Sequence, residues 1–288
     1  MTVEPRVIVT GLGFPEGPVF LGNGEVVVTE IRGQCLTRCS EGSSTVIAMT
    51  GGGPNGATID ADGELWVANN GGLSVGPGGY WFADGGLIEG RIQRVTLDGG
   101  CEDMPPLAGE QPHRPNDLCF GPDGKLYFTD PRNWEDFANF KVGRLWRLDT
   151  QTRDAQVVAD VPMFCNGIAF GADGRLYVAQ SNIMRIIAFD WTPGGFGDPR
   201  EFARLPRGFP DGLSFAANGD CYACGSMGDV IQVFDADGAL KETIEFPEHT
   251  EPTNCCFGDG VLYVTCSGTG ELLAFDLGVE GLPLHPYR

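Results

Sequence analysis

Residues 165–180 read C-N-G-I-A-F-G-A-D-G-R-L-Y-V-A-Q, and this segment is one of six related ones along the chain. The six segments begin at Pro15, Pro54, Pro115, Cys165, Pro210 and Pro252, so that successive starts lie 39, 61, 50, 45 and 42 residues apart. Internal repeats at intervals of this size are typical of propellers and solenoids. The repeat therefore decides the fold class before any single motif is considered.

Each segment contains two short apolar runs separated by a turn. In residues 165–180 the runs are G-I-A-F and L-Y-V-A, and A-D-G lies between them. Asp-Gly or Asn-Gly between such runs is a strong signal for a β-hairpin. Third strands are predicted at 36–38, 91–97, 143–148, 186–190, 230–234 and 272–276, and fourth strands at 45–49, 155–158, 201–205 and 241–245. Four antiparallel strands in each of six units predict an all-β, six-bladed β-propeller.

The sixth unit ends near residue 277 with only three strands. A spare strand at residues 6–11 precedes the first segment, so we expect it to complete the last blade and close the ring, which removes exposed sheet edges. Residues 1–288 are thus predicted to form a single propeller domain. Insertions at 71–90 in blade two and 132–141 in blade three are expected on the top face, where loops carry substrate contacts.

The composition narrows the possible partners. The net charge of −20 would repel nucleic-acid phosphates. No stretch approaches the roughly 18 apolar residues of a membrane span, and the first residues lack an apolar signal segment, so a cytoplasmic protein is expected. Most of the ten cysteines lie among apolar strand residues, where they are expected as small buried side chains rather than disulfides.

The second residue of each segment, which we call the ring residue, varies along the repeat. The ring residues are Glu16, Asn55, Asn116, Asn166, Asp211 and Thr253. Each starts the innermost strand of its blade, so the first five should face the neck of a central channel. The second strands end at the same edge, which should place Glu30, Asn69, Asp130 and Gln180 around the same mouth.

Two carboxylates and several amide oxygens form a hard donor set that suits Ca²⁺, with Mg²⁺ or Mn²⁺ as alternatives. The three histidines, at 113, 249 and 285, have no ligand spacing, which argues against a histidine–cysteine zinc site. The alternative is that asparagine and aspartate only hold turns through their side chains. That alternative does not explain Glu16, a poor turn residue, at the same position of the repeat.

The motifs resemble those of the senescence marker protein, gluconolactonase and luciferin-regenerating enzyme family over nearly the whole chain. They are P-E-G-P-V-F at Pro15, R-P-N-D at Arg114, Y-F-T-D-P at Tyr127, C-N-G-I-A-F at Cys165 and P-D-G at Pro210. The resemblance implies a six-bladed propeller with one divalent metal in the central channel. It also implies hydrolysis of a small sugar lactone. Ca²⁺ is the expected cation, with Mn²⁺, Mg²⁺, Zn²⁺ or Fe²⁺ as alternatives.

The resemblance also assigns roles to single residues. Glu16, Asn166 and Asp211 match the metal ligands, and Asn116 matches a position that binds the metal or faces the substrate. Arg114 matches a substrate-contacting arginine, for which a surface ion pair is the alternative. Asn55 is a less diagnostic substrate contact. His113, beside Arg114, is either a bystander or a base.

For lactone opening the metal would polarise the ring carbonyl while an aspartate activates water. Asp211 and Asp130 are the candidates for this general base, and the sequence leaves the choice open. A metal-bound carboxylate is a weaker base, which favours Asp130, but Asp130 could instead orient neighbouring asparagines. Tyr80, Trp81 and Phe82 are expected either to wall the pocket or to pack beneath a loop.

Two other functions compete with this hypothesis. One is a promiscuous propeller esterase or phosphotriesterase, and the other is a propeller that binds a small molecule or protein without catalysis. A serine hydrolase is disfavoured, because no serine lies within a few residues of a histidine.

Overall fold

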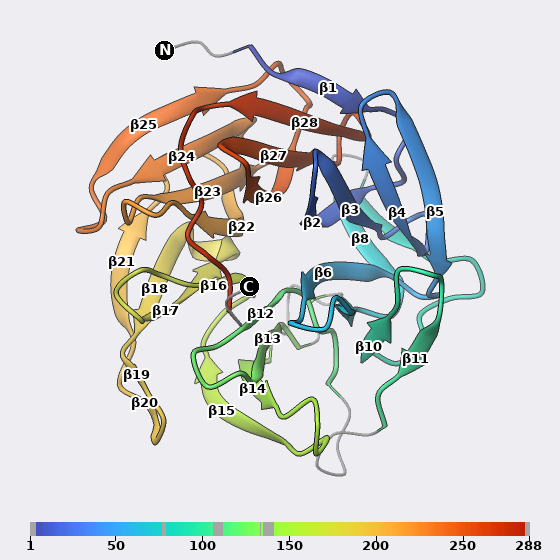
Figure 1. The fold of residues 1–288 in the computed structure, drawn as a ribbon. Coiled ribbons are helices and arrows are strands. Elements are labelled where there is room, and N and C mark those ends of the chain that lie inside the picture. The colour runs from blue at the N-terminus through green and yellow to red at the C-terminus, as the bar shows by residue number, and fades with distance from the viewer. Residues whose placement is uncertain (1–3, 77–78, 106–111, 133, 135–140, 286–288) are drawn as a thin grey trace.

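Six four-stranded antiparallel sheets surround a common centre in the computed structural model (Figure 1). The structure describes residues 4–76, 79–105, 112–132, 134 and 141–285. Blade one consists of β2 (Pro15–Gly22), β3 (Glu25–Glu30), β4 (Cys35–Ser40) and β5 (Ser43–Met49). Blade two consists of β6 (Pro54–Ile59), β7 (Leu65–Asn69), β10 (Arg91–Val95) and β11 (Cys101–Asp103). Blade three consists of β12 (Leu118–Phe120), β13 (Leu126–Asp130), β14 (Gly143–Leu148) and β15 (Ala155–Val161).

The second half of the ring repeats this order. Blade four consists of β16 (Cys165–Phe170), β17 (Leu176–Gln180), β18 (Arg185–Phe189) and β21 (Arg200–Arg204). Blade five consists of β22 (Phe209–Phe215), β23 (Cys221–Ser226), β24 (Val230–Phe234) and β25 (Leu240–Glu245). Blade six consists of β26 (Pro252–Gly258), β27 (Val261–Cys266), β28 (Glu271–Asp276) and β1 (Arg6–Val9). The predicted six-bladed propeller is confirmed.

The N-terminal strand closes the ring as expected. β1 pairs antiparallel with β28, with Arg6 opposite Ala274 and Val7 opposite Leu273. The Arg6 guanidinium also donates to the Asp276 carboxylate, at 3.1 Å from Nε. One blade strand was missed from the sequence: β11, the outer strand of blade two, is only three residues long and alternates little in polarity.

The hairpin turns explain why the repeat contains Asp-Gly. In blade four the Gly171 amide donates to the Arg175 carbonyl at 3.0 Å, and the Asp173 carboxylate accepts the Arg175 amide at 3.0 Å. Gly174 has a φ of 76°, in the left-handed region where a β-carbon is unfavourable. Aspartate therefore closes the turn through its side chain, and glycine supplies the required backbone angle.

The core is divided among the interfaces between successive blades. Separate buried clusters join blades one and two, two and three, three and four, four and five, five and six, and six and one. Trp146 and Phe128, whose rings stack at 5.9 Å, lie in the cluster between blades two and three. Because each blade has a neighbour on both sides, burial of apolar surface favours closure of the whole ring.

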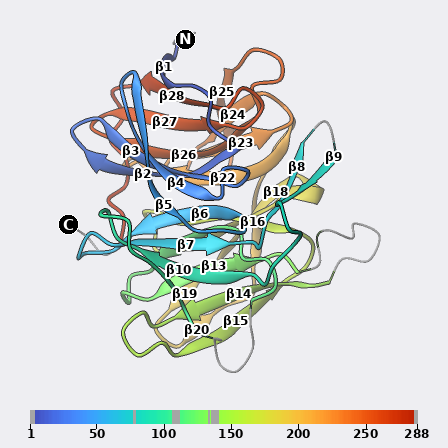
Figure 2. The same ribbon diagram turned by 90° about the vertical axis from the view of Figure 1, so that its right-hand side faces the viewer.

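The blade-two insertion forms a separate two-stranded sheet, in which β8 (Leu73–Gly76) pairs with β9 (Gly79–Phe82). Figure 2 shows this hairpin protruding from one face of the propeller, while the C-terminal residues lie on the opposite face. Blade four carries a smaller hairpin, β19 (Trp191–Thr192) and β20 (Gly195–Phe196), and the 3₁₀ turn η2 (Ser181–Ile183). The blade-three insertion lies largely outside the described residues, which include only its positions 132, 134 and 141.

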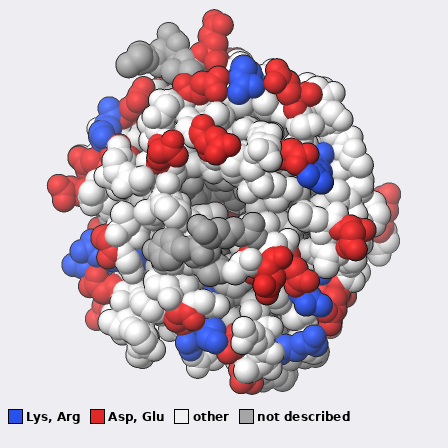
Figure 3. All heavy atoms as spheres, in the orientation of Figure 1, with Lys and Arg blue, Asp and Glu red and all other residues white. Residues whose placement is uncertain are grey.

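The cysteines are free thiols, as expected from the sequence, and charged side chains lie on the surface. Figure 3 shows acidic and basic side chains scattered over the periphery of the face that carries the C-terminal residues. All ten cysteines are free thiols, and eight of them are buried. Within the described part of the chain, no helix has the length and apolar character needed to cross a membrane.

Candidate active site in the central channel

Five of the ring residues line one cavity of about 310 Å³ at the end of the channel where the first strands begin. They are Glu16, Asn55, Asn116, Asn166 and Asp211. Four of them are buried: Glu16, Asn55 and Asn116 are 4–6% exposed, and Asn166 is 9% exposed. The sixth ring residue, Thr253, is buried and donates its hydroxyl to the Pro15 carbonyl at 2.8 Å. The repeat thus brings together the oxygen-bearing side chains expected from the sequence.

Hydrogen bonds between neighbouring blades fix the backbone of this ring. The Thr129 hydroxyl of blade three donates to the Asn166 carbonyl of blade four at 2.8 Å. The Gly56 amide of blade two donates to the Asn116 carbonyl of blade three at 2.7 Å. The Ser181 hydroxyl, which follows the second strand of blade four, donates to the Pro210 carbonyl at 2.7 Å. The side chains of the ring are therefore presented by a rigid backbone circle.

The environment of the two ring carboxylates, Glu16 and Asp211, disfavours their charged forms. Burial, together with the nearby charge of Asp117, raises the pKa of Glu16 to about 8. Burial, with the charges of Glu16 and Asp117, raises the pKa of Asp211 well above its ordinary value. Hydrogen bonds from Asn166 and Ser226 to the Asp211 carboxylate oppose part of this rise. Repulsion among buried negative charges is relieved when a cation binds between them.

The donor set fits a divalent cation of the hard class. Two carboxylates and three amide side chains border the same space, and oxygen donors of this kind suit Ca²⁺, Mg²⁺ or Mn²⁺. No group of three or more histidine, cysteine, aspartate or glutamate side chains among the described residues is placed to hold a metal. Amide oxygens must therefore complete any coordination by Glu16 and Asp211. These residues would hold the ion that the sequence resemblance implies.

Two polar residues lie just below the ring and were missed in the sequence. Asp117 and Asn254 follow ring residues at the position that is glycine in the other four segments. A β-carbon on Gly56 would overlap Asp117, and one on Gly212 would overlap Asn254, so these glycines leave room for the larger side chains. Comparison of the third residue of each segment could have found both.

The Asp117 carboxylate is buried and is held by backbone amides. Leu118 donates to it at 2.8 Å and Ile168 at 3.3 Å, and Asn254 adds a side-chain hydrogen bond. Burial raises its pKa to about 6. Asp117 therefore adds negative charge beneath the ring, which would strengthen the attraction for a cation.

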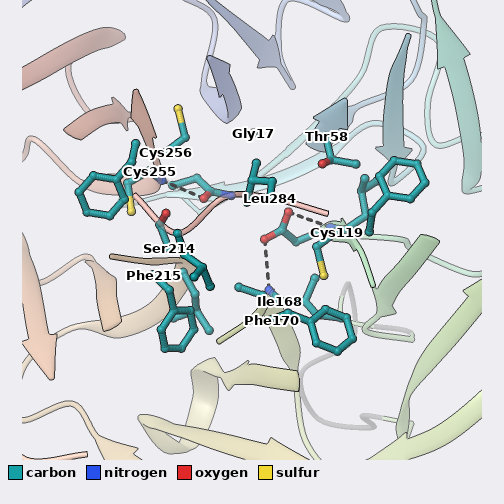
Figure 4. Close-up of a pocket in the computed structure, with 18 of the residues that line it drawn as sticks. Gly17, Thr58, Cys119, Ile168, Phe170, Ser214, Phe215, Cys255, Cys256 and Leu284 are labelled. Atoms are coloured by element: carbon teal, nitrogen blue, oxygen red, sulfur yellow. Dashed lines mark hydrogen bonds between the residues drawn. The ribbon is translucent and has the colours of Figure 1, made fainter. Parts of the chain in front are cut away.

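A second, smaller cavity of about 100 Å³ lies at the other end of the channel (Figure 4). Its lining includes the C-terminal residues 282–285, which cross this end. The Leu282 amide donates to the Phe215 carbonyl at 2.8 Å, and His285 bridges to Phe120 and contacts the ring of Phe170 at 6.0 Å. Since blades three, four and five are contacted, the tail covers this end and the ring cavity opens on the opposite face.

Asp130 is buried, 1% exposed, and is not among the residues that line the ring cavity. Its carboxylate accepts the backbone amides of Arg114 at 2.7 Å and His113 at 3.0 Å, and the Trp146 indole at 3.3 Å. Burial raises the pKa of Asp130, and these hydrogen bonds oppose the rise. Asp130 thereby fixes the loop that leads into Asn116.

The residues that end the second strands of blades one, two and four also form hydrogen bonds with backbone groups. Glu30 accepts the Gly13 amide, Asn69 accepts the Gly53 amide at 2.9 Å, and Gln180 donates to the Pro162 carbonyl. All three are buried, so the expectation that they rim the open mouth is wrong. Each instead reaches across its own hairpin to the backbone just before a ring residue. Asp130 belongs to this set of loop anchors.

Arg114 and His113 also lie outside the cavity lining. Arg114 is 9% exposed, and its Nη1 donates to the carbonyls of Ile88 at 2.9 Å and Asn70 at 3.2 Å. Arg114 therefore contacts the blade-two insertion.

The wall above the ring is formed by residues that the sequence did not single out. Leu73, Trp134 and Phe164 form a buried cluster of their own, and Trp134 meets Phe164 edge-on at 5.5 Å. Leu73, Ser74 and Val75 of β8 line the cavity, whereas the expected aromatic run 80–82 lies on β9 and does not. Tyr80 instead donates to the Trp134 carbonyl at 3.1 Å, which supports the packing alternative.

The comparisons with known proteins agree with this geometry. Residues 14–268 match the model of the SMP-30/Gluconolactonase/LRE-like region. The chain belongs to this family. A gluconolactonase from Zymomonas mobilis is 26% identical over 281 residues, which cover 88% of this chain and 76% of that enzyme. The chain spans less than two thirds of the mammalian adipocyte plasma membrane-associated proteins that it also matches.

Solved structures share the fold along nearly the whole chain. A gluconolactonase from Xanthomonas campestris superposes with a TM-score of 0.79 and 25% identity, covering 97% of this chain and 90% of the other. The calcium-binding protein regucalcin from Agrobacterium tumefaciens superposes with a TM-score of 0.78 at 18% identity, covering 99% and 98% of the two chains. The predicted family is confirmed, and the gluconolactonase relatives support a lactone-hydrolysing enzyme.

Proposed function

We propose that the protein is a divalent-metal-dependent hydrolase that opens a small lactone, with sugar lactones such as gluconolactone as the reference substrates. The observation that carries the proposal is the convergence of Glu16, Asn55, Asn116, Asn166 and Asp211 on one cavity. Glu16, Asn116, Asn166 and Asp211 are the proposed metal ligands, and Ca²⁺ is the proposed cation. Bound there, a divalent cation supplies Lewis acidity at the lactone carbonyl.

The reaction requires a base for the attacking water. Water adds to the carbonyl carbon, the bond between the acyl carbon and the ring oxygen breaks, and a hydroxy acid leaves as carboxylate and proton. We assign the base to Asp211, because Asp211 lines the cavity that the substrate must enter, whereas Asp130 does not. Asn166 and Ser226 orient the Asp211 carboxylate through their hydrogen bonds.

Asp130 and Arg114 have supporting roles in this proposal. Asp130 fixes the backbone before Asn116, and Arg114 joins that backbone to the insertion whose β8 strand walls the cavity. Both are therefore positioning residues, and neither contacts the lactone. The apolar wall lowers the local water content, which strengthens the electrostatic interactions at the ring.

The variant Glu16→Gln tests the metal assignment. Loss of one of two ring carboxylates should weaken Ca²⁺ binding at least about tenfold, since even residues that only orient ligands affect affinity by that much. Titration calorimetry of chelator-treated protein with Ca²⁺ and Mn²⁺ measures the effect. Glu25→Gln, on the far end of the same hairpin, is the matched control and should bind as the parent does. Equal affinity in Glu16→Gln and the parent would remove Glu16 from the site.

Hydrolysis is then compared across gluconolactone, xylonolactone, arabinolactone and dihydrocoumarin in a pH-stat. A protein that binds the cation but hydrolyses none of them, nor aryl esters or phosphotriesters, would be a non-catalytic binding propeller.

A further inference from the structure

The cavity has a polar floor and an apolar wall. The ring residues form the floor, whereas Phe14, Leu73, Val75, Phe164, Phe209 and Met227 belong to the wall. Serine and asparagine side chains interrupt this wall, but no lysine, arginine or histidine lines the cavity in the part of the chain that the structure describes. A ligand whose reacting group reaches the floor therefore places its remaining atoms against hydrocarbon.

The wall is a built structure that joins several blades. Leu73 is fully buried in the cluster with Trp134 and Phe164, which links blades two, three and four. On the blade-one side the Arg32 guanidinium lies 5.2 Å from the Phe14 ring centre and donates to the Ser74 hydroxyl at 3.2 Å. These contacts hold the apolar side chains in place without a ligand.

The outer part of the wall is open to solvent. Phe209 is 41% exposed and Met227 is 52% exposed, and both line the cavity. An apolar group that covers them would remove hydrocarbon surface from water, and each methylene buried in this way improves binding by about fourfold. Methionine also adapts to ligands of irregular shape.

Arg114, which the sequence resemblance matches to a substrate contact, lies outside the cavity lining. Arg114 donates to the carbonyls of Ile88 and Asn70 and does not line the cavity. A polyhydroxylated lactone would bring several hydroxyls against the apolar wall, and a hydroxyl buried without a partner is unfavourable.

We propose that this site prefers lactones with an apolar substituent, an alkyl chain or an aryl ring, over polyhydroxylated sugar lactones. The preference rests on the proposed lactonase function and changes only the substrate class. The carbonyl carbon reaches the ring residues, and the substituent lies along the wall between Val75, Phe209 and Met227. The bonds formed and broken are those of lactone hydrolysis.

The first experiment compares kcat/KM for δ-decalactone, the unsubstituted δ-valerolactone and glucono-δ-lactone with the metal-loaded protein. We expect kcat/KM for δ-decalactone to exceed the values for the other two lactones by at least about tenfold, because burial of only a few methylenes of its alkyl chain would give that factor. A value for glucono-δ-lactone equal to or above that for δ-decalactone would overturn the preference, while leaving the lactonase function intact.

A double variant tests the wall directly. Phe209→Gln with Met227→Gln should reduce the ratio of kcat/KM for δ-decalactone over glucono-δ-lactone by about tenfold. Both side chains are exposed, so the fold should be kept. Leu240→Gln, 45% exposed on the outer strand β25, is the control and should leave the ratio unchanged. An unchanged ratio in the double variant would contradict the proposal.

Binding separates the preference from catalysis. Calorimetry with the slowly hydrolysed 6-pentyl-2-piperidone and with gluconolactam measures affinity alone, and we expect the pentyl lactam to bind at least about tenfold more tightly. That result without hydrolysis of any lactone would support the apolar site and refute the proposed reaction. Tighter binding of gluconolactam would refute the apolar site.

Discussion

Replacing Asp211 with asparagine should reduce kcat/KM for lactone opening by about 10³-fold, within the range that a positioned general base contributes. The amide has nearly the size of the carboxylate and can still offer an oxygen to a cation, but it cannot accept a proton from water. Initial rates are measured in a pH-stat at several cation concentrations, so that loss of the base is separated from weaker cation binding.

The exposed turn residue Asp237 provides the control for this variant. Asp237→Asn keeps the ring intact and should retain the parent rate. If Asp211→Asn at saturating cation kept more than about a tenth of the parent kcat/KM, Asp211 would not be the general base.

Replacing Asp130 with alanine should chiefly destabilise the fold. The change leaves the amides of Arg114 and His113 and the Trp146 indole without their buried acceptor. Each orphaned donor costs about 1–3 kcal/mol, so the free energy of unfolding should fall by about 3 kcal/mol or more. Urea denaturation measures this loss.

The activity of the folded Asp130→Ala protein distinguishes the two aspartates. A residue that orients a neighbour changes activity by about 10- to 100-fold, less than the loss expected for the base. A loss of about 10³-fold in the folded variant, with normal stability, would make Asp130 the base instead of Asp211.

Much of the fold could be predicted from the sequence because the repeat is written in short-range signals. Asp-Gly turns and alternating apolar runs determine hairpins locally, and the missing fourth strand of blade six identified β1 as the closing strand. The short strand β11 was missed, since three residues carry too little alternation to distinguish a strand from a loop.

The part of the site that the repeat positions, the ring residues, could be predicted from the sequence. Glu16, Asn166 and Asp211 lie near the start of β2, β16 and β22, and Asn116 lies just before β12. Their positions therefore follow from the repeat. The direction of Arg114 does not, because it depends on carbonyls of the insertion at residues 70 and 88 that no local pattern specifies. The burial of Asp130 likewise depends on Trp146, which is distant in sequence and belongs to the next strand of the same blade.

The most direct test of the account is lactone hydrolysis by protein stripped with a chelator and then titrated with Ca²⁺ or Mn²⁺. The account predicts no hydrolysis above the uncatalysed rate in the stripped protein, and recovery that saturates at one cation per chain. Full activity in protein shown by elemental analysis to be free of metal would contradict it.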